Sequence, residues 1–387
     1  MIIMSKSWDI IQHTRVRFPP FESSLMVPDH LPIAERHLTL HTNITDLSSV
    51  EDIVLPPVKF GEEDSWLIER KFVIRDGEGN EQKWLPVGGD DSRPFPPIVE
   101  RQRQGWYLTP SPIHRLSRKV VTVAVIVFLS ALTYQFIEPL FIWAGVLSQP
   151  LVGSIRVGLL DYPFLMLFVL PWMILPLAMR IGANIRDLRR QKSFLNNPPA
   201  APEISFSNQA ISDEELLIQL SLPQVQENWL DLDVFVQVGL LPPARETLLE
   251  ALSRNENQQP PPGMSTPLPH YWEKGLSDGT GIGEETPLER QGVSGGMFLR
   301  PMRIWQKSES YPLSLDGGDL QITLPKGWPG TQAGSFVRIH WELILQINRV
   351  THGPLFWVLP LRVANGSGPF EMATLKVNDG RSEESIN

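Results

Sequence analysis

The chain of 387 residues contains no cysteine. This absence excludes disulfide bonds, zinc sites with thiolate ligands, iron–sulfur clusters and a cysteine nucleophile. It also fits soluble parts that lie in a reducing compartment. Positive charge is in the minority as well, because 34 Lys and Arg stand against 43 Asp and Glu and give a net charge of −9. Such a balance argues against a nucleic-acid-binding protein.

No arrangement of residues predicts catalysis. Gly279–Gly283 has closely spaced glycines, but a phosphate-binding loop needs a strand before it and a helix after it. Ser294 lacks the strand–turn–helix context of a hydrolase nucleophile. His30, His37 and His41 lie close together, and the last two have helical i, i+4 spacing, yet a zinc site needs a third ligand. We therefore expect no catalytic, cofactor-binding or metal-binding residue, and we predict solvated histidines on a loop or strand.

Two long apolar segments predict a transmembrane helical hairpin within residues 113–180. The first runs from about Val120 to Leu147 and the second from about Leu159 to Met179. About 20 apolar residues suffice to cross the hydrocarbon layer of a bilayer. The alternative, two buried helices of a soluble core, is disfavoured because a soluble helix rarely stays apolar on every face.

Basic residues flank this hairpin asymmetrically. Five Lys or Arg residues precede the first helix and five follow the second, whereas the connecting loop holds only Arg156. Cytoplasmic flanks carry such an excess of positive charge. The sequence therefore predicts a multi-pass protein of the cell membrane with both termini in the cytoplasm. The flanking residues are Arg101, Arg103, Arg115, Arg118, Lys119, Arg180, Arg186, Arg189, Arg190 and Lys192.

Residues 1–25 form a doubtful or disordered extension in this interpretation. Arg15–Pro20 can be reverse-translated into the stem and loop of a transfer-RNA T-arm. A reading frame extended into such a gene would produce this peptide, and the start would then be Met26. The alternative is an ordinary basic, disordered arm. In both cases we expect residues 1–25 to be disordered and dispensable.

Residues 26–112 are predicted to form a mainly-β cytoplasmic region. The best hairpin joins Trp66–Ile74 to Lys83–Val87 through Asp76–Asn80, because Asp-Gly between β-forming residues favours a tight turn. The region is small for an independent core. We therefore expect it to pack against another part of the chain, such as the carboxy-terminal domain.

Residues 203–364 are predicted to form a β-sandwich. In Trp229–Val238 the alternation places Leu230 on one face with four further apolar residues, and Val337–Leu345 alternates in the same way. His340 falls on the polar face of the second segment, so we predict that it lies at the surface. The side chains expected to be buried are Trp341, Leu343, Phe356, Val358 and Leu361.

Three further segments are expected to lack a fold of their own. Residues 181–202 are predicted to be a basic and proline-rich linker, and residues 365–387 a tail. Residues 255–296 are rich in Pro, Gly, Glu and Ser. This composition is typical of a disordered insertion.

Three motifs near the carboxy terminus resemble those of a known group of proteins. Leu320–Thr331 is similar to a strand with a P-x-x-x-P-G-T turn, Val337–Leu343 to a V-x-W-x-L-E-V strand, and Gly353–Val363 to a G-P-x-F-x-x-x-F-x-L-P-V strand. Together they resemble the arrestin-like β-sandwich of uncharacterised microbial two-helix membrane proteins. Those proteins often carry an outside domain between the helices, where this loop is short, and the insertion at residues 255–296 is foreign to their pattern. The resemblance implies a binding fold and supplies no catalytic residues.

These expectations combine into a membrane protein with a helical hairpin and mainly-β cytoplasmic domains, including an arrestin-like or immunoglobulin-like β-sandwich. We predict a membrane-anchored protein-interaction module without catalytic activity, since a sandwich presents strand edges that can bind a partner peptide. The alternatives are an accessory subunit of a larger membrane complex and an enzyme of unknown type. The expected partners are the lipid bilayer and a membrane or cytoplasmic protein; no nucleic acid and no cofactor is expected.

Overall fold

The computed structural model describes residues 8–19, 31–42, 56–76, 81–82, 103–150, 153–241, 249–255, 258, 295–299, 302, 304–334, 336–366 and 370–377. The chain divides into two compact units. Residues 110–197 form a helical unit, whereas residues 1–109 and 198–387 together form a β unit. The helical unit is therefore an insertion between two parts of one β unit.

The helical unit contains two long helices, α3 (Ile113–Trp143) and α4 (Phe164–Asn196). Both are long and apolar enough to cross a membrane, since 31 residues of helix measure about 46 Å. The predicted pair of helices is confirmed, but its boundaries differ. α4 begins after the predicted Leu159 because β8 (Leu160–Pro163) pairs there with β7 (Ser154–Val157). It also continues to Asn196, so most of the predicted linker is helical.

Small residues line the buried side of the hairpin. Ser117, Ala124 and Ala131 of α3 are buried and repeat every seven residues, and α4 buries Val169 and Ala183. Small side chains at such spacing let two helices approach closely in a membrane. The large apolar side chains instead cover the exposed surface, as expected for helices that face lipid. They include Val121, Ile126, Leu129, Phe136, Leu140, Phe168, Leu170, Ile174, Leu177 and Ile181.

A buried carboxylate connects the two helices at their β-unit ends. Asp187 of α4 accepts hydrogen bonds from the backbone N–H of Ser111 and from Arg190, each at 3.0 Å. His114 of α3 contributes Nε2 at 3.0 Å from the same carboxylate. These contacts fix the entry of α3 against α4 where the chain joins the β unit.

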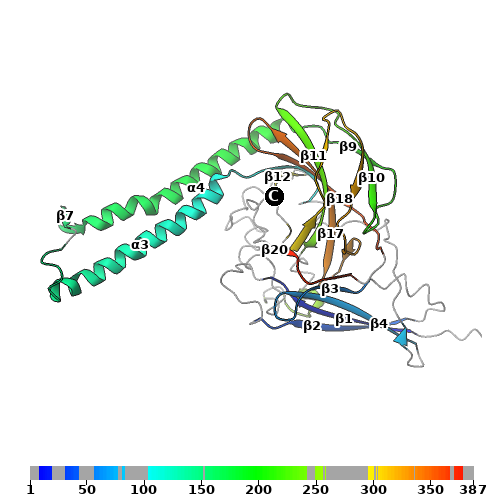
Figure 1. Ribbon diagram of the computed structural model, residues 1–387, viewed down its shortest axis with the longest axis horizontal. Coiled ribbons are helices and arrows are strands. Elements are labelled where there is room, and N and C mark those ends of the chain that lie inside the picture. The colour runs from blue at the N-terminus through cyan, green and yellow to red at the C-terminus, as the bar shows by residue number, and fades with distance from the viewer. Residues whose placement is uncertain are drawn as a thin grey trace, which may run out of the picture. The chain divides into compact units, whose positions relative to one another are not determined.

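A six-stranded sheet in the β unit has the order β19-β3-β4-β1-β2, with β5 also paired to β4 (Figure 1). β1 lies between β2 and β4 and pairs antiparallel with both. Ile10 and Val16 of β1 are fully buried, and Phe18 is buried too. The expected disorder of residues 1–25 is therefore wrong for residues 8–19. The strands are β1 (Trp8–Arg17), β2 (Ala34–Thr42), β3 (Val58–Gly61), β4 (Leu67–Asp76), β5 (Glu81–Gln82) and β19 (Phe370–Met372).

β4 covers most of the first arm of the predicted hairpin and pairs with β5, which precedes the predicted second arm. Ile74 pairs with Gln82 and Arg75 with Glu81 in antiparallel register. Residues 77–80 and 83–87, which complete the prediction, lie outside the described residues.

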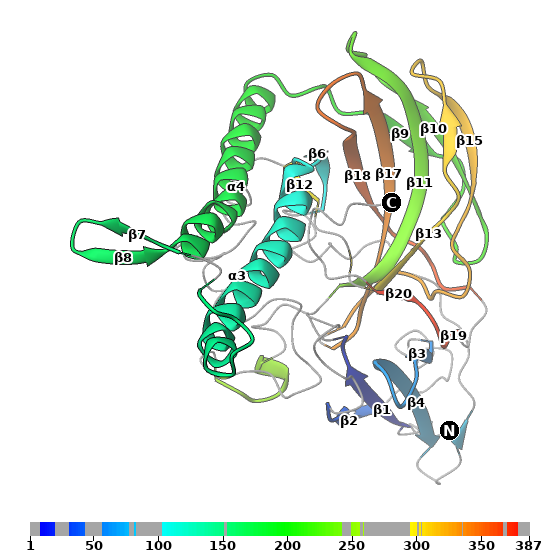
Figure 2. The same cartoon turned by 60° about the vertical axis from the view of Figure 1, so that its left-hand side comes forward.

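Two further sheets form the carboxy-terminal part of the β unit (Figures 1 and 2). The smaller sheet has the order β15-β10-β9 and lies beside the larger one, which has the order β12-β6-β18-β17-β11-β13-β20, with β14 paired to β11 and β16 to β17. Their strands are β6 (Gly105–Leu108), β9 (Glu203–Phe206), β10 (Glu215–Ser221), β11 (Trp229–Leu241), β12 (Gly295–Phe298), β13 (Ile304–Lys307), β14 (Tyr311–Leu313), β15 (Gly318–Thr323), β16 (Gln332–Ala333), β17 (Arg338–Arg349), β18 (Leu355–Leu361) and β20 (Lys376–Val377).

The core lies around β11 and β17, the two longest strands of the larger sheet. All five side chains predicted to be buried are buried: Trp341, Leu343, Phe356, Val358 and Leu361. Leu230 differs from the prediction and is 60 % exposed. A β-bulge between Trp229 and Asp231 shifts the register there, and a bulge turns the affected side chain to another face.

The turn after β15 joins the sheets. Trp328 is fully buried, and its ring centroid lies 4.7 Å from that of Phe60 in the six-stranded sheet. Nearby, Arg70 donates a hydrogen bond of 2.6 Å to Gln332. A Cβ atom at Gly330 would lie 2.3 Å from the carbonyl oxygen of Val363, so only glycine fits. As expected, the amino-terminal sheet packs against the carboxy-terminal part.

The segments expected to lack a fold are only partly described. The proposed tail contains β19, which pairs with β3, and β20, which pairs with β13. The proposed insertion ends inside β12, which pairs with β6. Residues 259–294, the greater part of that insertion, lie outside the described residues.

Candidate functional site

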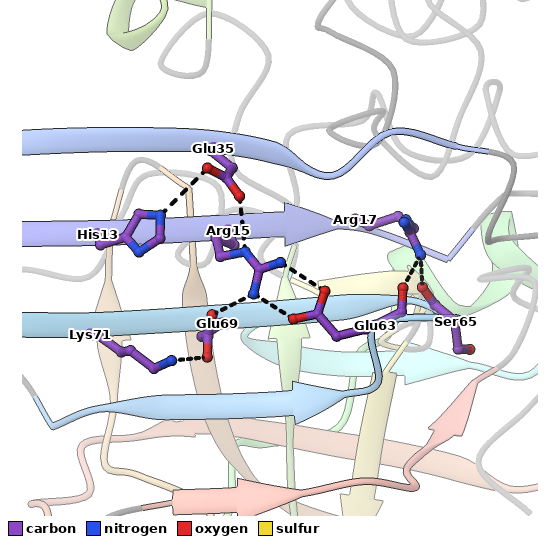
Figure 3. A network of polar contacts seen from close by, with 8 residues as sticks. All are labelled: His13, Arg15, Arg17, Glu35, Glu63, Ser65, Glu69 and Lys71. Atoms are coloured by element: carbon purple, nitrogen blue, oxygen red, sulfur yellow. Dashed lines mark hydrogen bonds and ion pairs between the residues drawn. The ribbon is translucent and has the colours of Figure 1, made fainter.

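One face of the six-stranded sheet carries a network of charged side chains (Figure 3). Side chains alternate along a strand, so the odd-numbered residues of β1 point away from the face that buries Ile10 and Val16. Residues of β2 and β4 stand beside them in register. We call this surface the charged face. Its members are His13, Arg15, Arg17, Glu35, His37, Glu63, Glu69 and Lys71.

Arg15 is the centre of the charged face. Its Nη1 and Nη2 donate to the two oxygens of Glu63 at 2.5 and 2.7 Å. Its Nε donates to Glu35 at 3.1 Å, and Nη1 also reaches Glu69 at 3.1 Å. The hydrogen bonds to Glu63 raise the pKa of Arg15, against the opposing effect of partial burial. The same contact with Arg15 lowers the pKa of Glu63.

The two other cations of the network, Lys71 and Arg17, also have acceptors. Lys71 lies 2.5 Å from Glu69, and Arg17 donates to the backbone carbonyl oxygens of Glu63 and Ser65 at 2.7 Å. Burial alone would raise the pKa of Glu69, but its hydrogen bonds with Lys71 and Arg15 outweigh this effect and lower it. These carboxylates are therefore ionised acceptors and poor general acids.

Two histidines and a glutamate occupy one end of the charged face. His13 of β1 and His37 of β2 are direct partners in the antiparallel register. Their rings stack with centroids 4.2 Å apart and an angle of 9° between the planes. Glu35 lies on the same face of β2, with Oε2 3.8 Å from Nε2 of His13. One nitrogen or oxygen from each residue lies within 4.8 Å of the others. We call these residues the histidine cluster.

A second polar group is buried in the larger sheet. Arg103 donates to both oxygens of Glu342, at 2.9 and 2.6 Å. Gln237 of β11 donates to one of these oxygens, and Nε2 of His340 lies 3.2 Å from the other. All four side chains are buried, and Glu342 has no exposed surface. We call this group the buried carboxylate cluster.

The buried carboxylate cluster holds its charges in fixed states. Burial alone would raise the pKa of Glu342, but the charge of Arg103 and the hydrogen bonds from His340 and Arg103 lower it to about 2. Burial also lowers the pKa of His340, with the charge of Arg103 acting in the same direction against the attraction of Glu342. The cluster therefore contains an ionised carboxylate, a guanidinium and a neutral imidazole. Because no atom of Glu342 reaches solvent, this carboxylate has no access to a substrate.

The predicted surface position of His340 is wrong, because this side chain is only 3 % exposed. The alternation in β17 predicts that its apolar residues lie on a buried face and its polar residues on a solvated face. In the structure residues on both faces of β17 are buried, and Ile344 on the second face belongs to an apolar cluster with Phe235 and Phe356 of the neighbouring strands. The polar residues of that face therefore bond to one another.

The other residues considered from the sequence have different outcomes. His37 is exposed on β2, as predicted, and His41 also belongs to β2. His30, Gly279–Gly283 and Ser294 lie outside the described residues. The sequence does not indicate a site at His13, which lies in the segment expected to be disordered, or at Glu35. The alternation of Gln12, Thr14 and Val16 with charged residues is the signal that could have indicated a strand.

Comparison with known proteins adds no family to these observations. Neither the models of protein families nor the curated proteins that were compared with the chain match it.

Proposed function

We propose that this protein is a membrane-anchored interaction module, in which the helical hairpin spans a bilayer and the β unit binds a protein partner without catalysing a reaction. The helices support the anchor, because their large apolar side chains are exposed while their small ones are buried. The charged groups support the proposed lack of catalysis, because the carboxylates of the charged face and Glu342 bond to arginine or lysine.

We further propose that both parts of the β unit lie in the cytoplasm. Sheets that combine strands from before and after the hairpin support the placement of both parts on the same side of the membrane. Trp106 of β6 pairs with Trp357 of β18, and Val58 of β3 pairs with Phe370 of β19. Strands on opposite sides of a bilayer could not share these ladders. The choice of the cytoplasmic side depends on the excess of Lys and Arg beside both helices.

We also propose an arrestin-like arrangement for the sandwich. The turn at Pro325–Thr331 supports it, since residues of all three motifs form hydrogen bonds there. The indole of Trp341 donates to the carbonyl oxygen of Pro329 at 2.9 Å. Thr331 donates to the carbonyl oxygen of Leu361 at 2.9 Å and accepts from the backbone N–H of Val363 at 3.0 Å. The three motifs thus meet in one network.

The open edge of β9 is the observation that carries the binding proposal. β9 ends the three-stranded sheet of the described residues. Its Phe206 is 44 % exposed although it stands in register with buried Ile218. An open edge beside an exposed aromatic side chain suits an extended peptide that adds a further strand. Only residues 197–202 separate β9 from helix α4, so anchoring would concentrate this edge near membrane-bound partners.

The geometry of β9 provides a sharp test. Ser207 donates to the carbonyl oxygen of Leu217 at 3.0 Å, so by alternation the N–H of Phe206 points to the open edge. Phe206→Pro removes this donor without removing a bond to β10, whereas the control Phe206→Val keeps it. Full-length protein in mild detergent should retain a membrane partner in a pull-down, and Phe206→Pro should reduce the amount by about 10-fold or more, as for a lost hot spot.

Two outcomes would reject the proposal. The first is equal retention of the partner by Phe206→Pro and Phe206→Val, which would exclude the β9 edge as the binding surface. The second is a preparation that retains no partner and shows hydrolase or transferase activity, which would replace binding by catalysis.

A further inference from the structure

The histidine cluster brings His13 together with Glu35 and His37, which follow it by 22 and 24 residues in the sequence. His13 and His37 face each other across β1 and β2, where direct partners have Cβ atoms about 5 Å apart. Glu35 precedes His37 by two residues and therefore shares its face of the strand. Two adjacent strands thus present two imidazoles and one carboxylate at a common point (Figure 3 shows His13 and Glu35).

We propose that His13, His37 and Glu35 form a binding site for a divalent transition metal ion, with Zn²⁺ as the best-suited ion. Imidazole nitrogen and carboxylate oxygen are ligands that Zn²⁺ takes in sites with three protein ligands, where water fills the fourth position. Mg²⁺ and Ca²⁺ prefer sites made of oxygen ligands alone. The composition of the cluster therefore selects the softer ions.

An unpaired nitrogen supports the site independently of composition. Nε2 of His13 is buried and has no hydrogen-bond partner among the described residues. Leaving a buried polar atom without a partner costs about 1–3 kcal/mol, and a bound metal ion would satisfy this atom. Oε2 of Glu35 lies 3.8 Å from this nitrogen.

Arg15 holds the carboxylate in a useful orientation. Its Nε donates to Oε1 of Glu35 at 3.1 Å, which leaves Oε2 on the side of His13. Hydrogen bonds of this kind orient metal ligands in proteins. The positive charge of Arg15 itself disfavours a cation, but Glu63 and Glu69 accept hydrogen bonds from it and balance that charge.

Binding requires a small movement of the side chains. Ligand atoms around tetrahedral Zn²⁺ are about 3.3 Å apart, whereas those of the cluster lie within 4.8 Å. The lone pairs of the two stacked rings also lie in nearly parallel planes, since the ring planes differ by 9°, so at least one ring must turn for both to reach a common ion. His37 and Glu35 are exposed, so His37 can rotate and Glu35 can approach without disturbing the sheet. The bound ion would then link β1 to β2, an effect that goes beyond the proposed partner binding and does not depend on it.

The test uses full-length protein in detergent, purified with a histidine-free affinity tag, and Zn²⁺ alone as the probe. Competition with a chromogenic chelator measures the affinity at about pH 7.5, where imidazoles are neutral. The wild type should bind one ion per chain. His37→Ala, His13→Ala and Glu35→Gln should each weaken binding by about 10-fold or more. Lowering the pH to about 5.5 should also release the ion, because the ligand imidazoles must be deprotonated.

The matched control is His352→Asn. His352 is an exposed histidine outside the cluster, with a positive φ of 76°, a conformation that asparagine tolerates. This variant should bind Zn²⁺ as the wild type does. Thermal unfolding in the presence of a chelator checks the fold of each variant, and the conservative Glu35→Gln carries the test if His13→Ala unfolds.

Three results would overturn the proposal. They are no binding by the wild type, binding by the His13→Ala/His37→Ala double variant within about threefold of the wild type, and equal weakening by the control. Co²⁺ substitution adds a spectroscopic check, since tetrahedral coordination gives intense visible absorption that the double variant should lack.

Discussion

The charged face and the buried carboxylate cluster pair the same residue types in different surroundings. In the charged face, Arg15 is 20 % exposed and its partner Glu63 is 60 % exposed. In the buried cluster, the corresponding values are 6 % for Arg103 and 0 % for Glu342. Exposed pairs contribute about 0–1 kcal/mol and weaken with salt. A buried pair adds little net stability, but removing one partner leaves an uncompensated charge and costs about 3–5 kcal/mol.

A short distance between arginine and glutamate does not show how much the free energy of unfolding changes when the pair is broken. Distances are similar, since Arg15 reaches Glu63 at 2.5 Å and Arg103 reaches Glu342 at 2.6 Å. Solvent access decides what happens when either pair is broken.

Deletion of residues 1–25 should have the largest effect, because it removes β1 and with it Arg15, the centre of the charged face. β1 is bonded to both β2 and β4, so its loss would separate these strands. We expect the six-stranded sheet to unfold, and limited proteolysis should cut readily within β2–β4. The control deletion of residues 1–7 leaves β1 intact and should preserve resistance. Equal resistance of the two truncated proteins would restore the view that residues 1–25 are dispensable.

Arg103→Ala should destabilise the protein by about 3–5 kcal/mol, because Glu342 would lose its buried counter-charge. Urea unfolding of the full-length protein in detergent, followed by tryptophan fluorescence, measures the loss. The double variant Arg103→Met/Glu342→Gln removes both charges and should recover part of the stability. A single variant as stable as the wild type would show that water reaches the cluster.

As the pH falls, the stability that depends on the buried carboxylate cluster should decrease before that of the charged face. The pKa of His340 is lowered in the folded state, so the unfolded state binds the proton more readily below the usual histidine pKa of about 6.5. Stability from this group is therefore present above about pH 6.5 and lost as the pH falls. Glu342 adds a second loss between about pH 4.3 and its folded pKa of about 2. His340→Gln should flatten the stability profile between about pH 7 and 5; an unchanged slope would assign it to other groups.

Glu63→Gln should have the smallest effect, below about 1 kcal/mol, because Arg15 keeps Glu35 and Glu69 as partners. Repeating the unfolding at high salt should reduce even this difference. The cost of Arg103→Ala should persist under the same conditions. A salt-independent loss of several kcal/mol for Glu63→Gln would contradict the solvated character of the charged face.

The sequence predicted the two helices and the long strands well, because these elements depend on local patterns. Apolar length identifies α3 and α4, and period-two alternation identifies β11 and β17. The predicted start of the second helix at Leu159 and the predicted burial of Leu230 were wrong for local reasons that apolar length and alternation do not reveal. A short β-hairpin delays α4, and a β-bulge turns Leu230 outward.

The candidate sites were not predictable in the same way. His13 meets His37, and Arg103 meets Glu342, through strands that are distant in the sequence. No local pattern indicates such partners. His340 shows the same limit, since alternation states which residues share a face but not whether another layer covers it.

The insertion of the helices within the β unit also sets an order of events during synthesis. β6 needs β18, and their paired residues Trp106 and Trp357 are 251 positions apart (357 − 106). A ribosome adds about 5–20 residues per second, so β6 waits on the order of 10–50 s for its neighbour. During that interval α3 and α4 have already emerged, whereas the first strands present unpaired edges that favour aggregation. In the membrane-anchored arrangement proposed above, insertion of the helices would therefore precede completion of the β unit, and the nascent amino-terminal strands are where a chaperone would have to act.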